Sequence, residues 1–239
     1  NYNHPQIIEM IGMLGYDCLW VCNEHGYMDE SELATTILAA RAQGMDVMLR
    51  RNMSGYEEFL RPLEMGVHGF MVPRIRSVNY IEEVVDFVKF PPEGRRGIDG
   101  VNVDADFGLL GVQEYIKRAN EETFIVAQIE DKEAIPLIDD IAAVDGVDVL
   151  FVGPADLSLS LGMPGQFRDP AIMEIIDAVA EACKKHGKIA GTPPMGQDDV
   201  DRLLEKGFRF FTSSADYRFI KKGLLDMKET FKSAGFSFR

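Results

Sequence analysis

The chain has 239 residues, of which 46% are hydrophobic and 27% charged, which is enough apolar material for one large core and excludes a disordered tail or a small disulfide-bonded scaffold. Its 25 basic and 39 acidic side chains give a net charge of −14, the wrong sign for binding nucleic acid or an anionic membrane surface. No apolar run is long enough for a membrane span, and the three cysteines lack a CxxC pair, which favours a reducing, cytoplasmic compartment.

Seven short apolar runs predict β-strands, because each is rich in β-branched residues and bounded by Gly, Asp or Pro. They are Asp17–Cys22, Asp46–Arg51, Gly69–Pro73, Phe124–Glu130, Val147–Gly153, Lys188–Thr192 and Phe208–Ser214. Runs such as VLFVG are apolar on both faces, as expected for parallel strands that lie between a core and a layer of helices.

Segments with an apolar spacing of about 3.6 residues separate these strands and predict helices. Four of them stop at a glycine that leads into a strand, which is typical of a left-handed residue after the last helical turn. They are Glu30–Gln43, Gly55–Met65, Ala171–His186 and Asp198–Lys206. The stretch Pro91–Gly111 is the one long irregular segment, and loops of that length are usually functional or mobile.

Repeated strand–helix units over this length fit either a doubly wound sheet or a (β/α)₈ TIM barrel. No glycine-rich GxGxxG follows a strand, which weakens the dinucleotide-binding alternative. We therefore predict a single barrel domain over residues 1–239. Because a barrel needs eight strands and seven are visible, the first strand is expected to lie before Asn1.

Polar side chains follow several of the predicted strands, at the edge where ligands bind in parallel α/β folds. Glu130 and Asp156 end adjacent strands, and two carboxylates that converge there suit Mg²⁺ or Mn²⁺. His25 is the histidine at a strand end, and Arg50 could face an oxyanion beside a metal.

Each of these residues also has a purely structural interpretation. Glu130 could pair with Lys132, and Asp156 could cap the turn at 157–160. Arg50 could pair only with Glu24 or Asp46, and His25 could be a surface residue. Cys18 and Cys22 face the same side of one strand, where small core residues are the favoured interpretation.

Several of these motifs, taken in order, resemble the HpcH/HpaI aldolase family. The motifs are NEH at 23–25, LRR at 49–51, MVP at 71–73, PPEGRRG at 91–97, QIEDKEA at 128–134 and VGPADLS at 152–158. QIE followed by GPADLS is the specific signal, and the resemblance covers nearly the whole chain.

The resemblance implies a metal-dependent pyruvate aldolase that cleaves a 4-hydroxy-2-oxo acid to pyruvate and an aldehyde. It implies a divalent metal, with Mg²⁺ favoured over Mn²⁺ or Co²⁺, on Glu130 and Asp156. It also implies a homo-oligomer, a hexamer or trimer of dimers whose subunits exchange their C-terminal helices.

The resemblance further assigns roles to the other site residues. Arg50 would hydrogen-bond the C2 oxygen of the substrate, and His25 would act as acid and base on the 4-hydroxyl proton. Glu24 would hold a metal-bound water, and Gln128 would support the metal site. The backbone at Ala155 and Asp156 would bind the pyruvate carboxylate.

Three departures from the family pattern affect the expectation. Cys22 stands where the family generally has an aspartate that orients the histidine. Without that carboxylate His25 is expected to be a weaker base, unless Glu64 substitutes for it. The loop after GRRG carries three acids, Asp99, Asp104 and Asp106, which are expected to disfavour an acidic aldehyde. The third departure is that the family's first strand is not found in this sequence.

Two other functions remain open. One is a CoA-ester lyase of the malyl or citryl type, which the acidic chain without a basic groove weakly disfavours. The other is a catalytically impaired barrel that only binds metal and 2-oxo acids, for which Cys22 is the best support.

Overall fold

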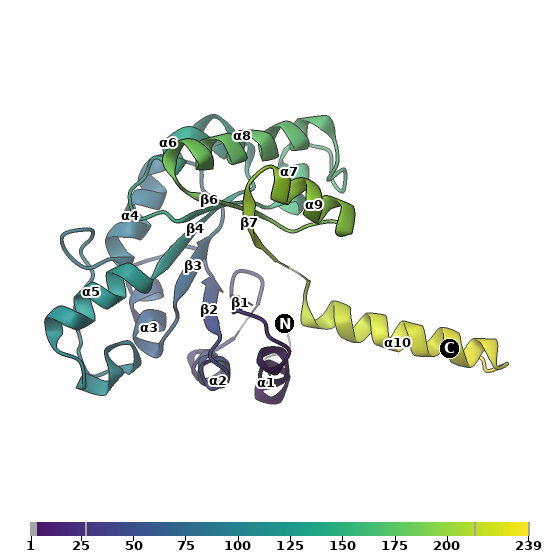
Figure 1. Ribbon diagram of the computed structural model, residues 1–239, viewed down its shortest axis with the longest axis horizontal. Helices are drawn as coiled ribbons and strands as arrows, with labels where there is room; N and C mark the ends of the chain where they lie inside the picture. The colour runs from purple at the N-terminus through teal and green to yellow at the C-terminus, as the bar shows by residue number, and fades with distance from the viewer. Residues whose placement is uncertain (1–3, 27, 213, 239) are drawn as a thin grey trace.

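The computed structural model describes residues 4–26, 28–212 and 214–238, and in these residues seven parallel strands form one sheet in chain order (Figure 1). The strands are β1 (Cys18–Cys22), β2 (Asp46–Arg50), β3 (Gly69–Val72), β4 (Phe124–Ile129), β5 (Val149–Val152), β6 (Ile189–Thr192) and β7 (Phe208–Phe211). All seven predicted strands are confirmed, with ends that differ by up to three residues. The predicted end of the last strand includes Ser213, which lies outside the described residues.

Helices between successive strands lie on the outer side of the curled sheet, one further helix precedes β1, and the last follows β7 (Figure 1). The α-helices are α1 (Pro5–Met13), α2 (Glu30–Arg41), α3 (Glu57–Met65), α4 (Val78–Val88), α5 (Val112–Glu122), α6 (Ile138–Ala142), α7 (Pro154–Ser160), α8 (Pro170–His186), α9 (Gln197–Glu205) and α10 (Asp216–Ser233), and the 3₁₀ segments are η1 (Val103–Gly108) and η2 (Lys132–Leu137). The four glycines predicted to follow helices have φ between 68° and 99°. Their left-handed conformation confirms the predicted helix ends.

The sheet curls into a half-barrel, which is consistent with a TIM-like barrel. Each strand pairs with its neighbours in the chain, so β1 and β7 form the two edges of the described sheet. The predicted parallel α/β architecture is therefore confirmed. The eighth strand expected before Asn1 stays a prediction.

Apolar side chains pack on both faces of the sheet because successive residues of a strand point to opposite sides. Residues such as Val47, Leu49 and Val72 point outward into the large core beneath the helices. A smaller cluster fills the concave side, and it consists of Met48, Met71, Val126, Val149 and Phe151, with Trp20 and Phe210 packed against it. The same alternation places polar residues at the strand ends on the concave face.

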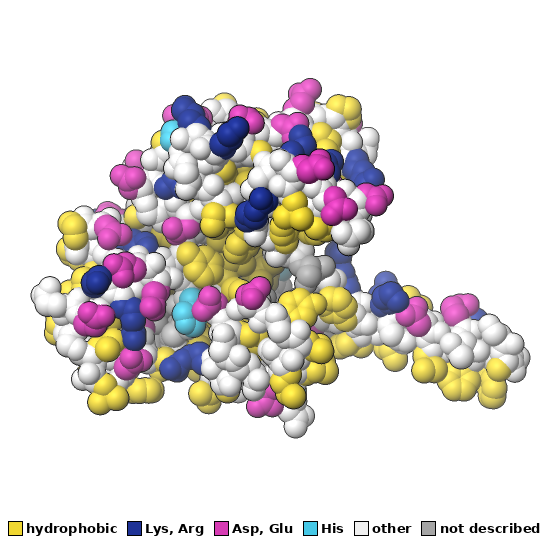
Figure 2. All heavy atoms as spheres, viewed as in Figure 1, with side chains coloured by type: hydrophobic (Ala, Val, Ile, Leu, Met, Phe, Trp, Pro, Cys, Tyr) yellow, Lys and Arg dark blue, Asp and Glu magenta, His cyan; other side chains and the backbone are white. Residues whose placement is uncertain are grey.

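Helix α10 extends away from the rest of the molecule (Figure 1). None of its residues is buried, and apolar side chains line one side of it in Figure 2. In the described part of the chain, no helix is long and apolar enough to cross a membrane.

Candidate active site

The carboxyl ends of β1 to β5 bring six charged or amide side chains to one edge of the sheet. Five of them were predicted, namely Glu24, Arg50, Gln128, Glu130 and Asp156, and the sixth is Arg74. The strand register explains this, because Cys22 pairs with Arg50, Arg50 with Met71, and Ile129 with Val152. The predicted convergence of these side chains is therefore present.

Glu130 is the most deeply placed of these groups, with no exposed surface. Its Oε1 accepts a hydrogen bond from the Arg74 backbone N–H at 3.0 Å, and its Oε2 accepts one from Gln128 Nε2. Burial raises the pKa of the Glu130 carboxyl to about 7, since removal from water disfavours the charged form. Glu130 contacts Arg74 and Gln128 instead of the Lys132 of the alternative interpretation.

Gly153 makes room for this carboxylate at the end of β5. A Cβ atom at position 153 would lie 2.8 Å from Gln128 Nε2 and 3.1 Å from Glu130 Oε2. Any side chain there would push on the buried pair, so the close approach of the two strand ends requires glycine.

Arg74 was not predicted, yet its guanidinium is the cation around which the carboxylates gather. Its Nη2 lies 2.9 Å from Asp156 Oδ1, and its Nη1 lies 3.3 Å from Asp131 Oδ1. Its Nε lies 3.4 Å from Glu24 Oε1 and 3.6 Å from Glu130 Oε1. Burial alone would lower the pKa of Arg74, but Glu130 and Asp156 raise it above its ordinary value, so the group stays charged.

Arg50 lies on the concave face, 8% exposed, with its guanidinium over the Trp20 ring at 5.0 Å. Its Nη2 donates to Cys22 Sγ at 3.1 Å, and its Nε lies 3.2 Å from Glu24 Oε2. The alternative pairing with Glu24 is therefore present. It does not exclude a role for Arg50, because both groups lie inside the site.

The two cysteines of β1 have different surroundings. Burial raises the pKa of the Cys18 thiol to about 12, as expected for a core residue. Burial acts in the same direction on Cys22, but hydrogen bonds from the His25 backbone and from Arg50 outweigh it and leave the pKa of Cys22 below its ordinary value. The interpretation of both cysteines as core residues is confirmed for Cys18 and wrong for Cys22, because Cys22 contacts a site arginine.

His25 lies at the rim of the site with a side chain that is 60% exposed. Its Nε2 is 3.7 Å from Glu24 Oε2. The predicted histidine is therefore next to the predicted glutamate and open to solvent.

Glu64 does not replace the acid that the family carries near its histidine. Glu64 lies at the end of α3 that leads into the start of β3, which is the opposite edge of the sheet. Burial and the neighbouring carboxylates of Asp104 and Asp99 raise the pKa of Glu64, whereas Arg96 lowers it. Its electrostatic neighbours thus belong to the long loop and not to the site.

Two of the acids in the loop 91–111, Asp104 and Asp106, are neutralised by arginines, which corrects their predicted role. Asp104 pairs with the buried Arg96 and accepts a hydrogen bond from the Tyr115 hydroxyl, and Asp106 pairs with Arg118 at 2.8 Å. The same loop places Val103 beside Gly66, at the end of α3. The loop is therefore an anchored structural segment at this point, and Asp104 and Asp106 are not free to repel an acidic aldehyde.

Unsatisfied buried polar atoms mark the site as a place for a ligand. In the described residues, Trp20 Nε1, Glu24 Oε2, Arg50 Nε and Gln128 Oε1 are buried without a hydrogen-bond partner. The Arg50–Glu24 pair is close but too poorly aligned for a hydrogen bond. Buried polar groups normally have partners, so this concentration on the concave face indicates that further polar groups bind here.

The oxygen donors fit a hard divalent cation in kind and in charge. In the residues that the structure describes, no three His, Cys, Asp or Glu side chains are arranged as a ready ligand set. The Arg74 guanidinium instead lies against both Glu130 and Asp156. Ala155 and Asp156 occupy the first turn of α7, where backbone N–H groups point out of the helix.

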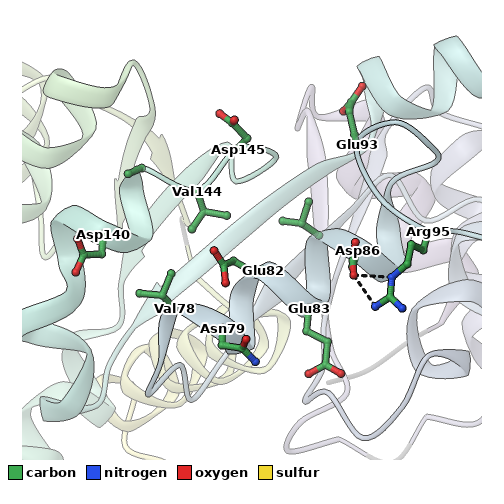
Figure 3. A pocket seen from close by; sticks show the side chains of 12 residues that line it. Val78, Asn79, Glu82, Glu83, Asp86, Glu93, Arg95, Asp140, Val144 and Asp145 are labelled. Carbon is green, nitrogen blue, oxygen red and sulfur yellow. Dashed lines mark hydrogen bonds and ion pairs between the residues drawn. The ribbon is translucent and has the colours of Figure 1, made fainter.

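A broad acidic groove lies elsewhere, on the outer helical layer between α4 and α6 (Figure 3). Its acids include Glu82, Asp86, Asp140 and Asp145, and Arg95 pairs with Asp86. None of its lining residues belongs to the strand-end site. It therefore adds nothing to the chemistry of that site.

The fold and the strand-end residues define an α/β enzyme with a site of buried carboxylates and arginines. The HpcH/HpaI aldolase/citrate lyase family pattern matches residues 1–220, and the chain belongs to that family. A relative from Shigella boydii serotype 18 (strain CDC 3083-94 / BS512), a 5-keto-4-deoxy-D-glucarate aldolase, is 29% identical over 230 residues, which cover 96% of this chain and 89% of the relative. The chain is thus a carbon–carbon lyase of aldolase type.

Solved structures share this fold, and one of them belongs to the same family. The HpcH/HpaI aldolase from Desulfitobacterium hafniense DCB-2 has a TM-score of 0.92 at 30% identity and covers 97% of this chain and 90% of its own. The citrate synthase SbnG has a TM-score of 0.89, also at 30% identity, with 98% and 91% covered. A more distant match in fold is CitE from Mycobacterium tuberculosis in complex with magnesium, acetoacetate and coenzyme A, with a TM-score of 0.53 at 19% identity, covering 87% and 72%.

Proposed function

We propose that this protein is a divalent-metal-dependent aldolase that cleaves a 4-hydroxy-2-oxo acid to pyruvate and an aldehyde. The observation that carries the proposal is the buried carboxylate of Glu130, which meets Asp156 at the Arg74 guanidinium, at the strand-end edge that also carries Arg50. The kinship with 5-keto-4-deoxy-D-glucarate aldolases supports a polyhydroxylated substrate of this class.

Glu130 and Asp156 would hold the metal, and Mg²⁺ is the favoured ion because both donors are hard oxygens. When bound, the metal supplies positive charge next to the carboxylate and keto oxygens of the substrate. Gln128 keeps Glu130 in place through the hydrogen bond to Oε2. The backbone at Ala155 and Asp156, at the start of α7, binds the substrate carboxylate.

Arg50 stabilises the negative charge that develops on the C2 oxygen when the carbon–carbon bond breaks. Its guanidinium is positioned by Trp20, Cys22 and Glu24, so little reorganisation is needed during the reaction. Its Nε is paired with Glu24 at 3.2 Å but has no well-aligned hydrogen-bond partner.

His25 takes the proton from the 4-hydroxyl group in the cleavage direction, directly or through a water. Its exposed ring, 3.7 Å from Glu24, can exchange that proton with solvent. Glu24 would orient a water in the site and stabilise the protonated imidazole 3.7 Å away.

The experiment is a measurement of pyruvate release from a panel of 4-hydroxy-2-oxo acids, before and after removal of divalent metal with EDTA. We expect EDTA to abolish release and Mg²⁺, Mn²⁺ or Co²⁺ to restore it. Undiminished activity after chelation would contradict the metal-dependent mechanism. The reverse reaction, pyruvate with a panel of aldehydes, identifies the aldehyde partner.

We infer further that α10 packs against another copy of the chain, as an exchanged helix of a homo-oligomer. Ile220, Leu224, Met227 and Phe231 repeat at intervals of four, three and four residues, which places them on one face of the helix, and all four are exposed. This exposed face of α10 is too apolar for a helix that is surrounded by water. Size determination by light scattering, with the full chain and with the chain ended after Ala215, tests this: we expect the shorter chain to lose the oligomer, and an unchanged mass would contradict the exchange.

A further inference from the structure

Arg74 occupies the place between the two carboxylates that the proposed function assigns to a metal. Its Nη2 lies 2.9 Å from Asp156 Oδ1 and its Nε lies 3.6 Å from Glu130 Oε1. These are the separations of a close ion pair. A metal cation bound to both carboxylates would therefore compete with the Arg74 guanidinium for the same oxygens.

The side chain of Arg74 can move toward solvent, whereas a hydrogen bond fixes its backbone. The backbone N–H donates to Glu130 Oε1 at 3.0 Å, and the residue has a φ of 57°, a left-handed conformation that non-glycine residues rarely adopt. The side chain is 35% exposed, so the guanidinium can rotate toward solvent without displacing core residues. The buried Arg50, enclosed by Trp20 and Glu24, has no such route.

The neighbouring acid offers the guanidinium a second partner. Asp131 lies 3.3 Å from Arg74 Nη1 and also pairs with Arg76, whose Nε lies 3.0 Å from Asp131 Oδ2. Asp131 is not one of the proposed metal ligands. Arg74 can therefore release Asp156 and still retain an ion pair.

We propose that Arg74 is a displaceable internal cation that competes with the divalent metal for Glu130 and Asp156 and so weakens metal binding. In the metal-free protein it neutralises Glu130 and Asp156, and in the metal-bound protein it leaves Asp156 for Asp131 and solvent. This proposal rests on the proposed function, because it takes Glu130 and Asp156 as the metal ligands.

The experiment measures Mn²⁺ binding to the full chain from the electron paramagnetic resonance signal of free Mn²⁺. It compares the wild type with Arg74→Ala and with the matched control Arg76→Ala. Both variants remove one positive charge next to Asp131, but Arg76 has no contact with Glu130 or Asp156 among the ion pairs of the described residues. Alanine keeps the left-handed strain that glycine would relieve, so the backbone cost is the same on both sides of the comparison.

We expect Arg74→Ala to bind Mn²⁺ about tenfold more tightly or better, and Arg76→Ala to stay within about threefold of the wild type, because close charge pairs couple far more strongly than distant ones. Equal affinity in wild type and Arg74→Ala would overturn the competition while leaving the metal-dependent aldolase intact. Weaker binding in Arg74→Ala would also overturn it. Absence of Mn²⁺ binding in all three proteins would overturn both the competition and the metal-dependent mechanism.

A second measurement on the wild type avoids dependence on the variant's folding. Phenylglyoxal modifies accessible arginines, and mass spectrometry locates the modified positions. We expect saturating Mn²⁺ to increase modification at Arg74 severalfold and to leave Arg95, an exposed arginine far from the metal ligands, unchanged. Protection of Arg74 by Mn²⁺, or no change, would contradict its displacement.

Discussion

Replacement of Arg50 tests the core of the proposed mechanism. Arg50 is the arginine that the sequence predicts to face the oxyanion, and in the structure it contacts Cys22 at 3.1 Å and Glu24 at 3.2 Å. Loss of one preorganised donor to a developing oxyanion typically costs about 10² to 10³ in turnover, which is about 2.7–4 kcal/mol. We therefore expect Arg50→Ala to lower kcat by at least about 10²-fold, while Mn²⁺ binding at Glu130 and Asp156 remains.

Arg50→Lys separates charge from geometry. Lysine keeps the positive charge beside Glu24 but lacks the planar fork that reaches Cys22 and the substrate together. We expect a smaller loss, of about tenfold, and less destabilisation than in Arg50→Ala, in which Glu24 keeps the longer contacts to Arg74 and His25. Arg51→Ala is the matched control, because Arg51 precedes the same loop but pairs with Glu58, 2.7 Å away.

The assay couples pyruvate release to NADH oxidation by lactate dehydrogenase and determines kcat and KM separately. A second readout follows the alkylation of Cys22 with pH. Arg50 lowers the pKa of this thiol, so its removal raises the pKa and moves the alkylation profile to higher pH. A wild-type kcat in Arg50→Ala would refute the oxyanion role, and an unshifted Cys22 profile would refute the contact itself.

Three further substitutions probe the site and its support. Glu130→Gln removes a metal ligand with little change of shape, so Mn²⁺ retention should be lost while circular dichroism stays native; retained Mn²⁺ would refute the assignment. Cys22→Asp places a carboxylate beside Arg50 and the His25 backbone, and we expect kcat to rise about three- to tenfold because the added negative charge favours protonation of the imidazole three residues further on; an unchanged or lower kcat would count against an impaired wild-type site. Arg96→Met leaves Asp104 unpaired and should lower the free energy of urea unfolding by about 3–5 kcal/mol, with part of the loss recovered by adding Asp104→Asn; a loss below about 1 kcal/mol would contradict the anchoring of the loop.

The sequence predicted the architecture well because its signals are local. Each strand is an apolar run with clear boundaries, and the helix-ending glycines Gly44, Gly66, Gly187 and Gly207 need only the backbone angles of one turn. The convergence of Glu130 with Asp156 also followed from topology, since the carboxyl ends of neighbouring parallel strands meet at one edge.

The missed features depend on which side chains meet across the fold. Nothing in the local sequence around Arg74 distinguishes it from Arg76. Of these two arginines, Arg74 points into the site because its φ is left-handed, and the preceding Pro73 does not predict that conformation. The loop acids were misread for the same reason. Asp104 finds Arg96 and Tyr115, which lies 11 residues further along the chain, and a spacing pattern contains no information on such a pair.

The two states of Arg74 lead to a stability test with opposite signs. Without metal, Arg74→Ala leaves Glu130 and Asp156 without their shared cation, so the variant should unfold at a lower temperature than the wild type. With metal, a tenfold tighter site adds about 1.4 kcal/mol at a saturating concentration, or about 3–6 °C for a domain of this length. Scanning calorimetry of both proteins with and without Mn²⁺ measures the two shifts. The metal-induced rise in Tm should therefore be larger in Arg74→Ala than in the wild type, and an equal rise in both proteins would show that metal and guanidinium do not share the carboxylates.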